Sequence, residues 1–246
     1  MIGIIGGTGL EKAGFFRQEK EIEHKTPFGE PTSKLSLGSI DDTSCVLIKR
    51  HGAMHTIPPT QVNNRANIYA LKEMGCKAIV ASSACGSLRQ EIGRGDLVLP
   101  DQFIDFTRHR EVSFFTSFKH GEMKHTPMAD PYNESLRNTF IETAKHLNID
   151  IHKTATVVSI EGPRFSTRAE SNMFRQWGAD IINMTTAPET ILANELGIPY
   201  VLIALSTDYD CWKTDEAPVS LNEVLKIFNQ NLEKLTKLLV AGIKAI

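Results

Sequence analysis

The stretch YVLIALSTDYDCWK, residues 200–213, decides the fold class of this chain. Its first part, 200–205, is a continuous apolar run, which is typical of a strand buried on both faces of a parallel sheet. Two hydroxyl residues end the run, and the carboxylates Asp208 and Asp210 follow at once. Carboxylates at the mouth of a buried strand suit metal binding, acid–base chemistry, recognition of an amine or an ordinary solvated turn.

Strand and helix patterns alternate on the N-terminal side of this stretch. Short apolar runs, typical of buried strands, lie at 3–5, 45–48, 78–81, 96–99, 154–160 and 181–184. Apolar residues at helical spacing lie at 61–74, 133–147, 168–177, 188–196 and, after a capping box at 220–223, in the last segment. This alternation predicts one α/β domain over residues 1–246, with a mixed, largely parallel central sheet flanked by helices. The His- and Phe-rich stretch 105–130 follows neither period and is expected to be a functional loop.

Composition excludes several classes of function. The chain is 41% hydrophobic and 23% charged, and its net charge is -2. It therefore lacks the net positive charge that would attract nucleic acid or anionic lipid. No apolar stretch approaches the ~18 residues of a membrane span, and the N-terminal MIGIIGGTGL lacks the basic region of a signal peptide. Four cysteines without CxxC spacing argue against zinc and against a disulfide framework. We therefore expect a cytoplasmic protein with neither nucleic-acid nor membrane partners.

Small and polar residues gather where the predicted strands end. These groups lie at 6–8, 50–51, 82–84, 161–163, 184–185 and 208–210. In open α/β sheets, ligands bind in the crevice beyond the carboxyl ends of the strands. Six strand ends with this composition therefore predict one ligand site.

An anion is the ligand that several of these residues favour. Arg50 supplies a planar, fixed charge, and Thr8, His51, Ser83 and Thr185 supply neutral donors. The glycine loop at 3–9 is neither GxGxxG nor a P-loop, so a tight turn and an anion-binding nest of N–H groups both remain open. A metal site is less favoured, because no further carboxylates flank the Asp-x-Asp pair.

Longer motifs extend over nearly the whole chain. They include IIGGTGL at 4–10, RHG at 50–52, HTIPP at 55–59, SACGSLR at 83–89, HTPMADP at 125–131, EGPRFSTRAES at 161–171, WGADIINMTTAPE at 177–189 and STDYDCWK at 206–213. With these motifs the chain resembles the methylthioadenosine phosphorylases, in the trimeric class of purine nucleoside phosphorylases. The resemblance implies a homotrimeric pentosyltransferase of purine and methionine salvage. Its reaction is phosphorolysis of S-methyl-5′-thioadenosine to adenine and 5-methylthioribose 1-phosphate, with inorganic phosphate as co-substrate and no metal or organic cofactor.

The resemblance also assigns roles to residues of this sequence. The residues implied for phosphate are Thr8, Arg50, His51, Ser83, Ala84 through its backbone N–H, and Thr185. Those implied for the purine and ribose are Phe165, Ser166, Met184, Asp208 and Asp210. Those implied for the 5′-methylthio pocket are Leu221, Val224 and His125, the last from a neighbouring subunit.

The two carboxylates suit an adenine. A carboxyl kept protonated by burial can donate to N7 as the purine leaves, and an ionised one accepts from the 6-amino group. By resemblance, Asp208 is the N7 donor and Asp210 supports the amine end, although the residues alone leave open which one is protonated. Family members that prefer 6-oxopurines carry Asn at the position of Asp208.

Three alternatives are kept. The first is a purine nucleoside or methylthioinosine phosphorylase that acts on 6-oxopurine nucleosides. The second is adenosine as a co-substrate, since the family's C-terminal tail, which covers the 5′ pocket, would follow Ile246. The third is a non-catalytic nucleoside-binding protein, which ranks lowest because the anion donors are all present.

Overall fold

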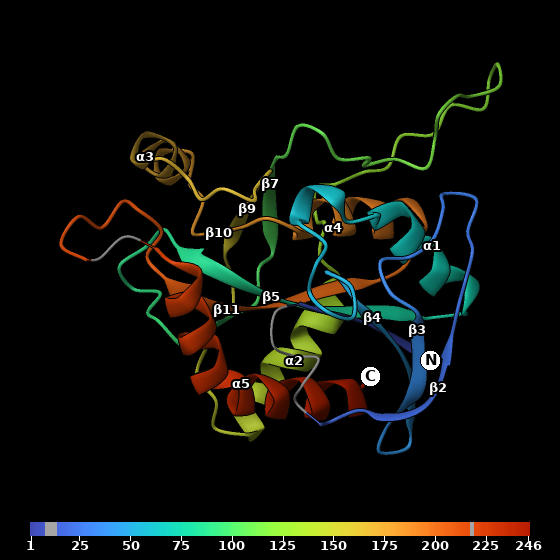
Figure 1. Cartoon of the computed structure of the whole chain (residues 1–246), viewed down its shortest axis with the longest axis horizontal. Coiled ribbons are helices and arrows are strands. Elements are labelled where there is room, and N and C mark those ends of the chain that lie inside the picture. Colours follow the sequence, from blue (N-terminus) through green and yellow to red (C-terminus); the bar gives the residue numbers. More distant parts are fainter. Residues whose placement is uncertain (8–13, 217–218) are drawn as a thin grey trace.

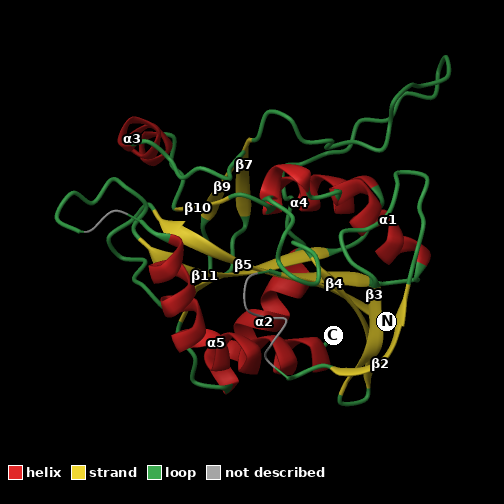
Figure 2. Ribbon diagram, viewed as in Figure 1, coloured by secondary structure: helices red, strands yellow, loops and turns green. Residues whose placement is uncertain are grey.

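A mixed sheet runs through the centre of the protein, with helices on both faces (Figures 1 and 2). The computed structural model describes residues 1–7, 14–216 and 219–246. Its strands are β1 (Ile2–Gly6), β2 (Arg17–Ile22), β3 (Leu35–Ile40), β4 (Thr43–Lys49), β5 (Ala78–Ser87), β6 (Leu97–Val98), β7 (Gln102–Phe106), β8 (Ile151–His152), β9 (Thr156–Ile160), β10 (Ile181–Asn183) and β11 (Tyr200–Asp208). Its helices are α1 (Asn64–Glu73), α2 (Glu134–His146), α3 (Arg168–Gln176), α4 (Thr186–Glu195) and α5 (Leu221–Lys244), with a 3₁₀ turn at Pro59–Gln61.

The strand order is β2-β3-β4-β1-β5-β10-β9-β7; off this path, β11 pairs with β5 and β6, and β6 pairs in turn with β8. Strand β1 pairs in parallel with both β4 and β5, and β5 pairs in parallel with β11. Strand β9 likewise pairs in parallel with β10 and β7, whereas the short contact between β10 and β5 is antiparallel. The predicted mixed, largely parallel sheet is confirmed.

Helices α1 and α4 cover one face of this sheet, and α2 and α5 cover the other (Figure 1). Successive strand residues alternate between the two cores: Ile79 and Leu202 belong to one, and Val80 and Ile203 to the other. Both faces are therefore apolar, which explains why residues 200–205 form an uninterrupted apolar run. None of the helices in the described residues combines the length and apolarity needed to cross a bilayer.

Helix boundaries follow the caps rather than the apolar periodicity. Helix α1 begins at Asn64, because Asn63 caps it by accepting from the N–H of Ala66 and a 3₁₀ turn precedes it; the predicted start at 61 was three residues early. Asn133 caps α2 in the same way. Ser220 accepts from the N–H of Glu223 at the start of α5, which is the N-cap half of the predicted capping box.

Strands β2, β3, β7 and β8 were not predicted. Strand β2 is an edge strand, RQEKEI, whose residues are mostly exposed, so it lacks the apolar signal of a buried strand. The predicted loop at 105–130 overlaps the end of β7 by two residues, and beyond it 107–130 contains neither helix nor strand. In Figure 1 this loop projects away from the sheet near α4.

Candidate functional site

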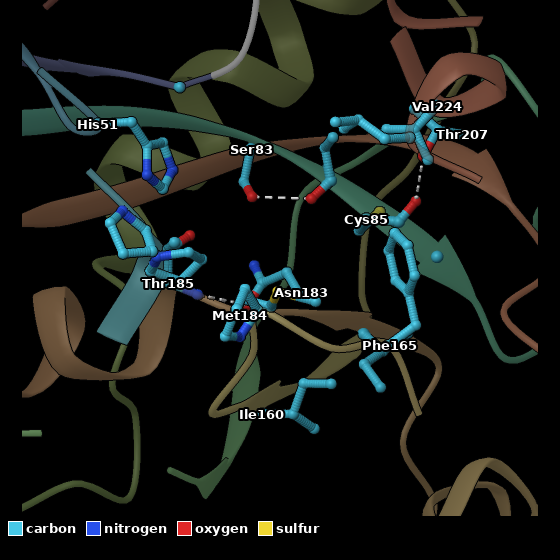
Figure 3. A pocket seen from close by; sticks show the side chains of 18 of the residues that line it. His51, Ser83, Cys85, Ile160, Phe165, Asn183, Met184, Thr185, Thr207 and Val224 are labelled. Atoms are coloured by element: carbon cyan, nitrogen blue, oxygen red, sulfur yellow. Dashed lines mark hydrogen bonds between the residues drawn. The ribbon is translucent and has the colours of Figure 1, made fainter. Parts of the chain in front are cut away.

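One cavity of about 420 Å³ lies where the strands β1, β4, β5, β9, β10 and β11 end. It is lined by residues that directly follow β1, β4 and β10 and by residues near the carboxyl ends of β5 and β11. The sequence-predicted residues that line it are Arg50, His51, Ser83, Ala84, Phe165, Ser166, Met184, Thr185, Asp208, Asp210, Leu221 and Val224. Figure 3 shows His51 and Thr185 on one side and Phe165 and Thr207 on the other, with Ser83 and Met184 between them.

A buried ion pair holds Arg50 at this cavity. The guanidinium is 1% exposed; its Nε donates to Glu189 Oε1 at 2.5 Å and its Nη2 to Glu189 Oε2 at 3.1 Å. Its Nη1 donates to the carbonyl of Ser82 at 2.9 Å. Glycine is required at position 7, since a Cβ there would lie 2.6 Å from Arg50 Nη1. The arginine therefore has one fixed orientation in the wall of the cavity.

Glu189 is fully buried and is stabilised in three ways. Besides the ion pair with Arg50, the hydroxyl of Tyr200 donates to Glu189 Oε2 at 2.7 Å. Glu189 also lies in the first turn of α4, where the helix dipole favours a negative charge. Sequence reasoning missed this role, because an acidic residue in a first helical turn is usually a solvated one.

His51 is neutral and is fixed as one tautomer. Its Nδ1 lies 2.9 Å from the carbonyl oxygen of Ile57, which can only accept, so Nδ1 carries the proton and Nε2 is an acceptor. Burial lowers the pKa of His51 to about 4, and the nearby charge of Arg50 adds to this effect. His51 therefore offers a lone pair at neutral pH rather than a positive charge.

The Asp208 carboxyl is enclosed at the opposite end of the cavity. Its Oδ2 accepts from the hydroxyl of Thr207 at 2.8 Å, and its Oδ1 accepts from the N–H of Asp210 at 2.8 Å. Burial raises the pKa of Asp208 from its ordinary value of 3.8 to about 6, because desolvation outweighs both hydrogen bonds. Gly86 allows this placement, since a Cβ on it would lie 2.8 Å from Asp208 Oδ1.

Asp210 has a different environment from Asp208. Burial raises its pKa, but the hydroxyls of Ser171 and Ser166 and the backbone N–H of Cys211 oppose the shift. Its φ of 48° places it in the left-handed region, which Asp tolerates better than most residues. The more strongly perturbed carboxyl of the pair, with a pKa of about 6, is Asp208.

The rest of the cavity is largely apolar and partly open. Phe165 is 40% exposed and Leu221, at the start of α5, is 60% exposed, whereas Val224 is buried. The side chain of Met184 packs against Gly162, where a Cβ would lie only 2.5 Å from Met184 Sδ. This end can accept an apolar group at the surface.

Within the described residues, His125 is the predicted site residue that does not line this cavity. Thr8 is outside the described residues. His125 lines a second cavity on the 107–130 loop, where its ring lies 6.4 Å from that of Phe118. Its predicted place at the site of a neighbouring subunit is therefore not tested by a single chain.

Several lining residues were given no individual role from the sequence. They are Gly7, His55, Thr56, Ile57, Pro58, Pro59, Cys85, Gly86, Ile160, Pro163, Ile182, Asn183 and Thr207. The HTIPP motif was the sequence signal available for residues 55–59. The other residues in this list are close in sequence to residues that were predicted. Within the described ranges, no cluster of three or more His, Cys, Asp or Glu side chains is placed to hold a metal ion.

The fold and the cavity place one polar site at the carboxyl ends of the strands of an α/β sheet. A fixed arginine, neutral donors and two buried carboxyls share one cavity. The arginine and the donors can bind an anion, and the carboxyls can bind a nitrogenous leaving group beside it. Comparisons with known proteins agree. Residues 1–244 match the model of the phosphorylase superfamily, and the chain belongs to this family.

The relatives include S-methyl-5′-thioadenosine phosphorylases from distant organisms. The Xenopus tropicalis protein is 51% identical and the Pyrococcus horikoshii protein 49% identical, each over 100% of this chain and over 88% and 92% of their own lengths. The methylthioadenosine phosphorylase of Schistosoma mansoni in complex with adenine superposes with a TM-score of 0.93 at 39% identity, covering 99% of this chain and 90% of its own. A variant of that enzyme in complex with methylthioadenosine has a TM-score of 0.92, with the same identity and coverage.

Proposed function

We propose that this chain catalyses the phosphorolysis of S-methyl-5′-thioadenosine to adenine and 5-methylthioribose 1-phosphate. The observation that carries the proposal is the pairing, in one cavity, of the fixed Arg50 guanidinium with the buried Asp208 carboxyl. The names of the relatives support the choice of substrate. The proposed setting is purine and methionine salvage in the cytoplasm, without a metal or organic cofactor.

Phosphate is the nucleophile in this proposal. Arg50, Ser83, Thr185 and the N–H of Ala84 hold it as the hydrogen phosphate dianion, and Thr8 is proposed to join them. The neutral His51 accepts from the phosphate O–H through Nε2. Because the protein positions an anion instead of activating a side chain, it needs no serine or cysteine nucleophile.

The reaction exchanges one bond at C1′ for another. The C1′–N9 bond breaks as a phosphate oxygen bonds to C1′, and positive charge develops on the ribose as in glycoside hydrolysis. The departing purine takes the proton of Asp208 at N7. Hydrogen phosphate loses its own proton on becoming the ester, and this proton returns Asp208 to its acid form through solvent. Phe165, Ser166 and Met184 are proposed to bind the base and the ribose.

A substrate panel tests the function. Purified protein with phosphate is expected to release adenine from methylthioadenosine, and to act more slowly on adenosine, inosine and methylthioinosine. The apolar Leu221 and Val224 favour a methylthio group, and Asp210 as an acceptor favours the 6-amino group. Base release is followed by chromatography, with and without phosphate. Faster turnover of inosine or methylthioinosine would assign the chain to the 6-oxopurine phosphorylases instead.

The pH dependence tests the role of Asp208. Only the acid form can donate to N7, so kcat/KM is expected to fall as the pH rises through about 6, the pKa of Asp208. His51 stays neutral throughout, because its pKa is about 4. The profile is measured between pH 5 and 8 at saturating phosphate, with buffers of constant ionic strength. A flat profile would remove Asp208 from the role of proton donor.

We also propose that the chain acts as a homotrimer in which His125 reaches the 5′ end of a neighbour's substrate. Sedimentation is expected to give three times the chain mass of 27.3 kDa. The shared site is tested by co-expressing His125→Ala and Asp208→Asn chains. Mixed trimers are expected to contain some sites with both native residues and to recover activity. If the mixture is no more active than the sum of the two variants, His125 does not act across subunits.

A further inference from the structure

Arg110 is a buried cation in a segment that is otherwise largely exposed. It lies four residues beyond the end of β7, and its side chain is 1% exposed, whereas His109 and Glu111 on either side are exposed. A guanidinium is seldom kept out of water unless acceptors surround it. Arg110 lies on the 107–130 loop, of which the proposed mechanism uses only His125, so the burial of this arginine needs a separate explanation.

The acceptors around Arg110 come from two other segments. Its Nε donates to Glu161 Oε1 at 2.7 Å, and its Nη2 donates to the carbonyls of Glu161 at 2.6 Å and Met184 at 3.1 Å. The other carboxylate oxygen, Glu161 Oε2, accepts from the backbone N–H groups of Arg108 at 2.6 Å and His109 at 3.1 Å. We call this set of contacts the Arg110–Glu161 clamp.

The clamp joins the ends of three neighbouring strands. Strands β7, β9 and β10 are parallel and adjacent, so their carboxyl ends lie at one edge of the sheet. Arg110 lies beyond β7, Glu161 directly follows β9, and Met184 directly follows β10. One guanidinium therefore fixes the spacing of three strand ends at the rim of the cavity.

Met184 is the point where the clamp reaches the cavity. Its carbonyl and the N–H of Thr185 form one peptide unit, and both residues line the cavity. Arg110 holds the carbonyl, and Asn183 Oδ1 accepts from the N–H at 3.4 Å. The Met184 side chain in turn packs on Gly162, the residue after Glu161. The position of the Met184 backbone is thus fixed by Arg110, and that of its side chain by the residue next to Glu161.

We propose that Arg110 is a positioning residue for phosphorolysis, which fixes the Met184–Thr185 peptide against which ribose and phosphate bind. This inference rests on the proposed function. A misplacement of about 1 Å can cost about 100-fold in rate, so a clamp outside the cavity can matter as much as a direct contact. The charge of Arg110 also reaches the anion end: after burial and Arg50, it is among the groups that lower the pKa of His51.

The test uses Arg110→Gln, Arg110→Lys and Glu161→Gln in the full-length chain, with KM measured separately for methylthioadenosine and phosphate. Arg110→Gln is expected to raise both KM values at least tenfold and to lower kcat/KM about 100-fold. Arg110→Lys keeps the charge but not the fork of donors, so it is expected to recover the KM for phosphate and not that for the nucleoside. Glu161→Gln is expected to raise the KM for the nucleoside about tenfold, because Arg110 loses its counter-ion.

Arg137→Gln is the matched control. Arg137 is a buried arginine on α2 that also donates to two backbone carbonyls, those of Pro100 and Lys153, but it is not among the residues that line the cavity. It is expected to lower the melting temperature as much as Arg110→Gln does and to leave both KM values unchanged.

Three results would overturn the inference. The first is that both KM values stay within threefold of native in Arg110→Lys and Glu161→Gln at equal folded fraction. The second is that only the KM for phosphate changes, since Arg110 would then act through its charge alone. The third is an equal change in the Arg137 control. If Arg110→Gln fails to fold, Glu161→Gln carries the test. A native protein that releases no adenine would refute the proposed function itself, before any variant is compared.

Discussion

Asp208→Asn is expected to lower kcat/KM for methylthioadenosine by about two to four orders of magnitude, which is the usual contribution of a positioned general acid. The amide cannot transfer a proton to N7, although it can still donate a hydrogen bond there. The loss for inosine is expected to be smaller, because an amide accommodates a 6-oxo group. The variant's preference therefore shifts toward 6-oxopurines, as measured by the ratio of kcat/KM for the two nucleosides.

The same substitution is expected to stabilise the fold above pH 6. Burial raises the pKa of Asp208 from 3.8 to about 6, so between these values the native state keeps a proton that the unfolded chain has released. The free energy of unfolding therefore falls as the pH rises through this range, by about 3 kcal/mol in all. Asparagine carries no ionisable group, so the variant does not lose stability by burying a charge at this position. The gain in melting temperature is expected at pH 7.5 and should vanish near pH 4.

Asp101→Asn is the control for the activity measurements. Asp101 accepts from the N–H of Ala155 at 2.9 Å and is not among the residues that line the cavity. It is expected to change neither the activity nor the preference between nucleosides. If folded Asp208→Asn protein turned over adenosine and methylthioadenosine within tenfold of the native rate, another group would have to protonate the purine.

Much of the fold could be predicted because its signals are local. Continuous apolar runs mark strands that are buried on both faces, and caps such as Asn133 and Ser220 mark where helices begin. Strand β2 could not be predicted, because an exposed edge strand made of charged residues has neither an apolar run nor turn residues within it. The short β8 has the same difficulty, since its two residues are only half-buried.

The residues that line the cavity could be predicted in large part, whereas the residues behind them could not. Arg50 and Asp208 lie at the ends of strands, so their convergence depends only on the parallel sheet. Glu189 and Arg50 are 139 positions apart, and no periodicity relates them. Arg110 lies in a segment without regular structure, so its burial depends on contacts that only the folded chain creates. A motif reports which residues are present, and tertiary packing decides which of them support the others.

Glu189→Gln is expected to destabilise the fold by about 3–5 kcal/mol, the usual cost of removing one partner from a buried ion pair. The change keeps the shape of the side chain but removes the carboxylate charge that is paired with the buried Arg50 guanidinium, and it weakens the acceptor of the Tyr200 hydroxyl. For a chain of this size the melting temperature should fall by roughly 6–20 °C. Tyr200→Phe removes only one hydrogen bond to a charged group and is expected to cost about 1.5–3 kcal/mol.

The effect of added phosphate on the melting temperature distinguishes a specific role of this ion pair from a general loss of packing. A phosphate dianion in the cavity supplies the negative charge that the Glu189→Gln variant lacks, so added phosphate is expected to raise the melting temperature of this variant more than that of the native protein. The control is Glu195→Gln on the same helix, where the carboxylate accepts from Ser113 and the N–H of Phe114 and is not part of the cavity. It should show the native response to phosphate. Equal responses in all three proteins would mean that Arg50 does not face bound phosphate, and the anion site would then have to be placed elsewhere.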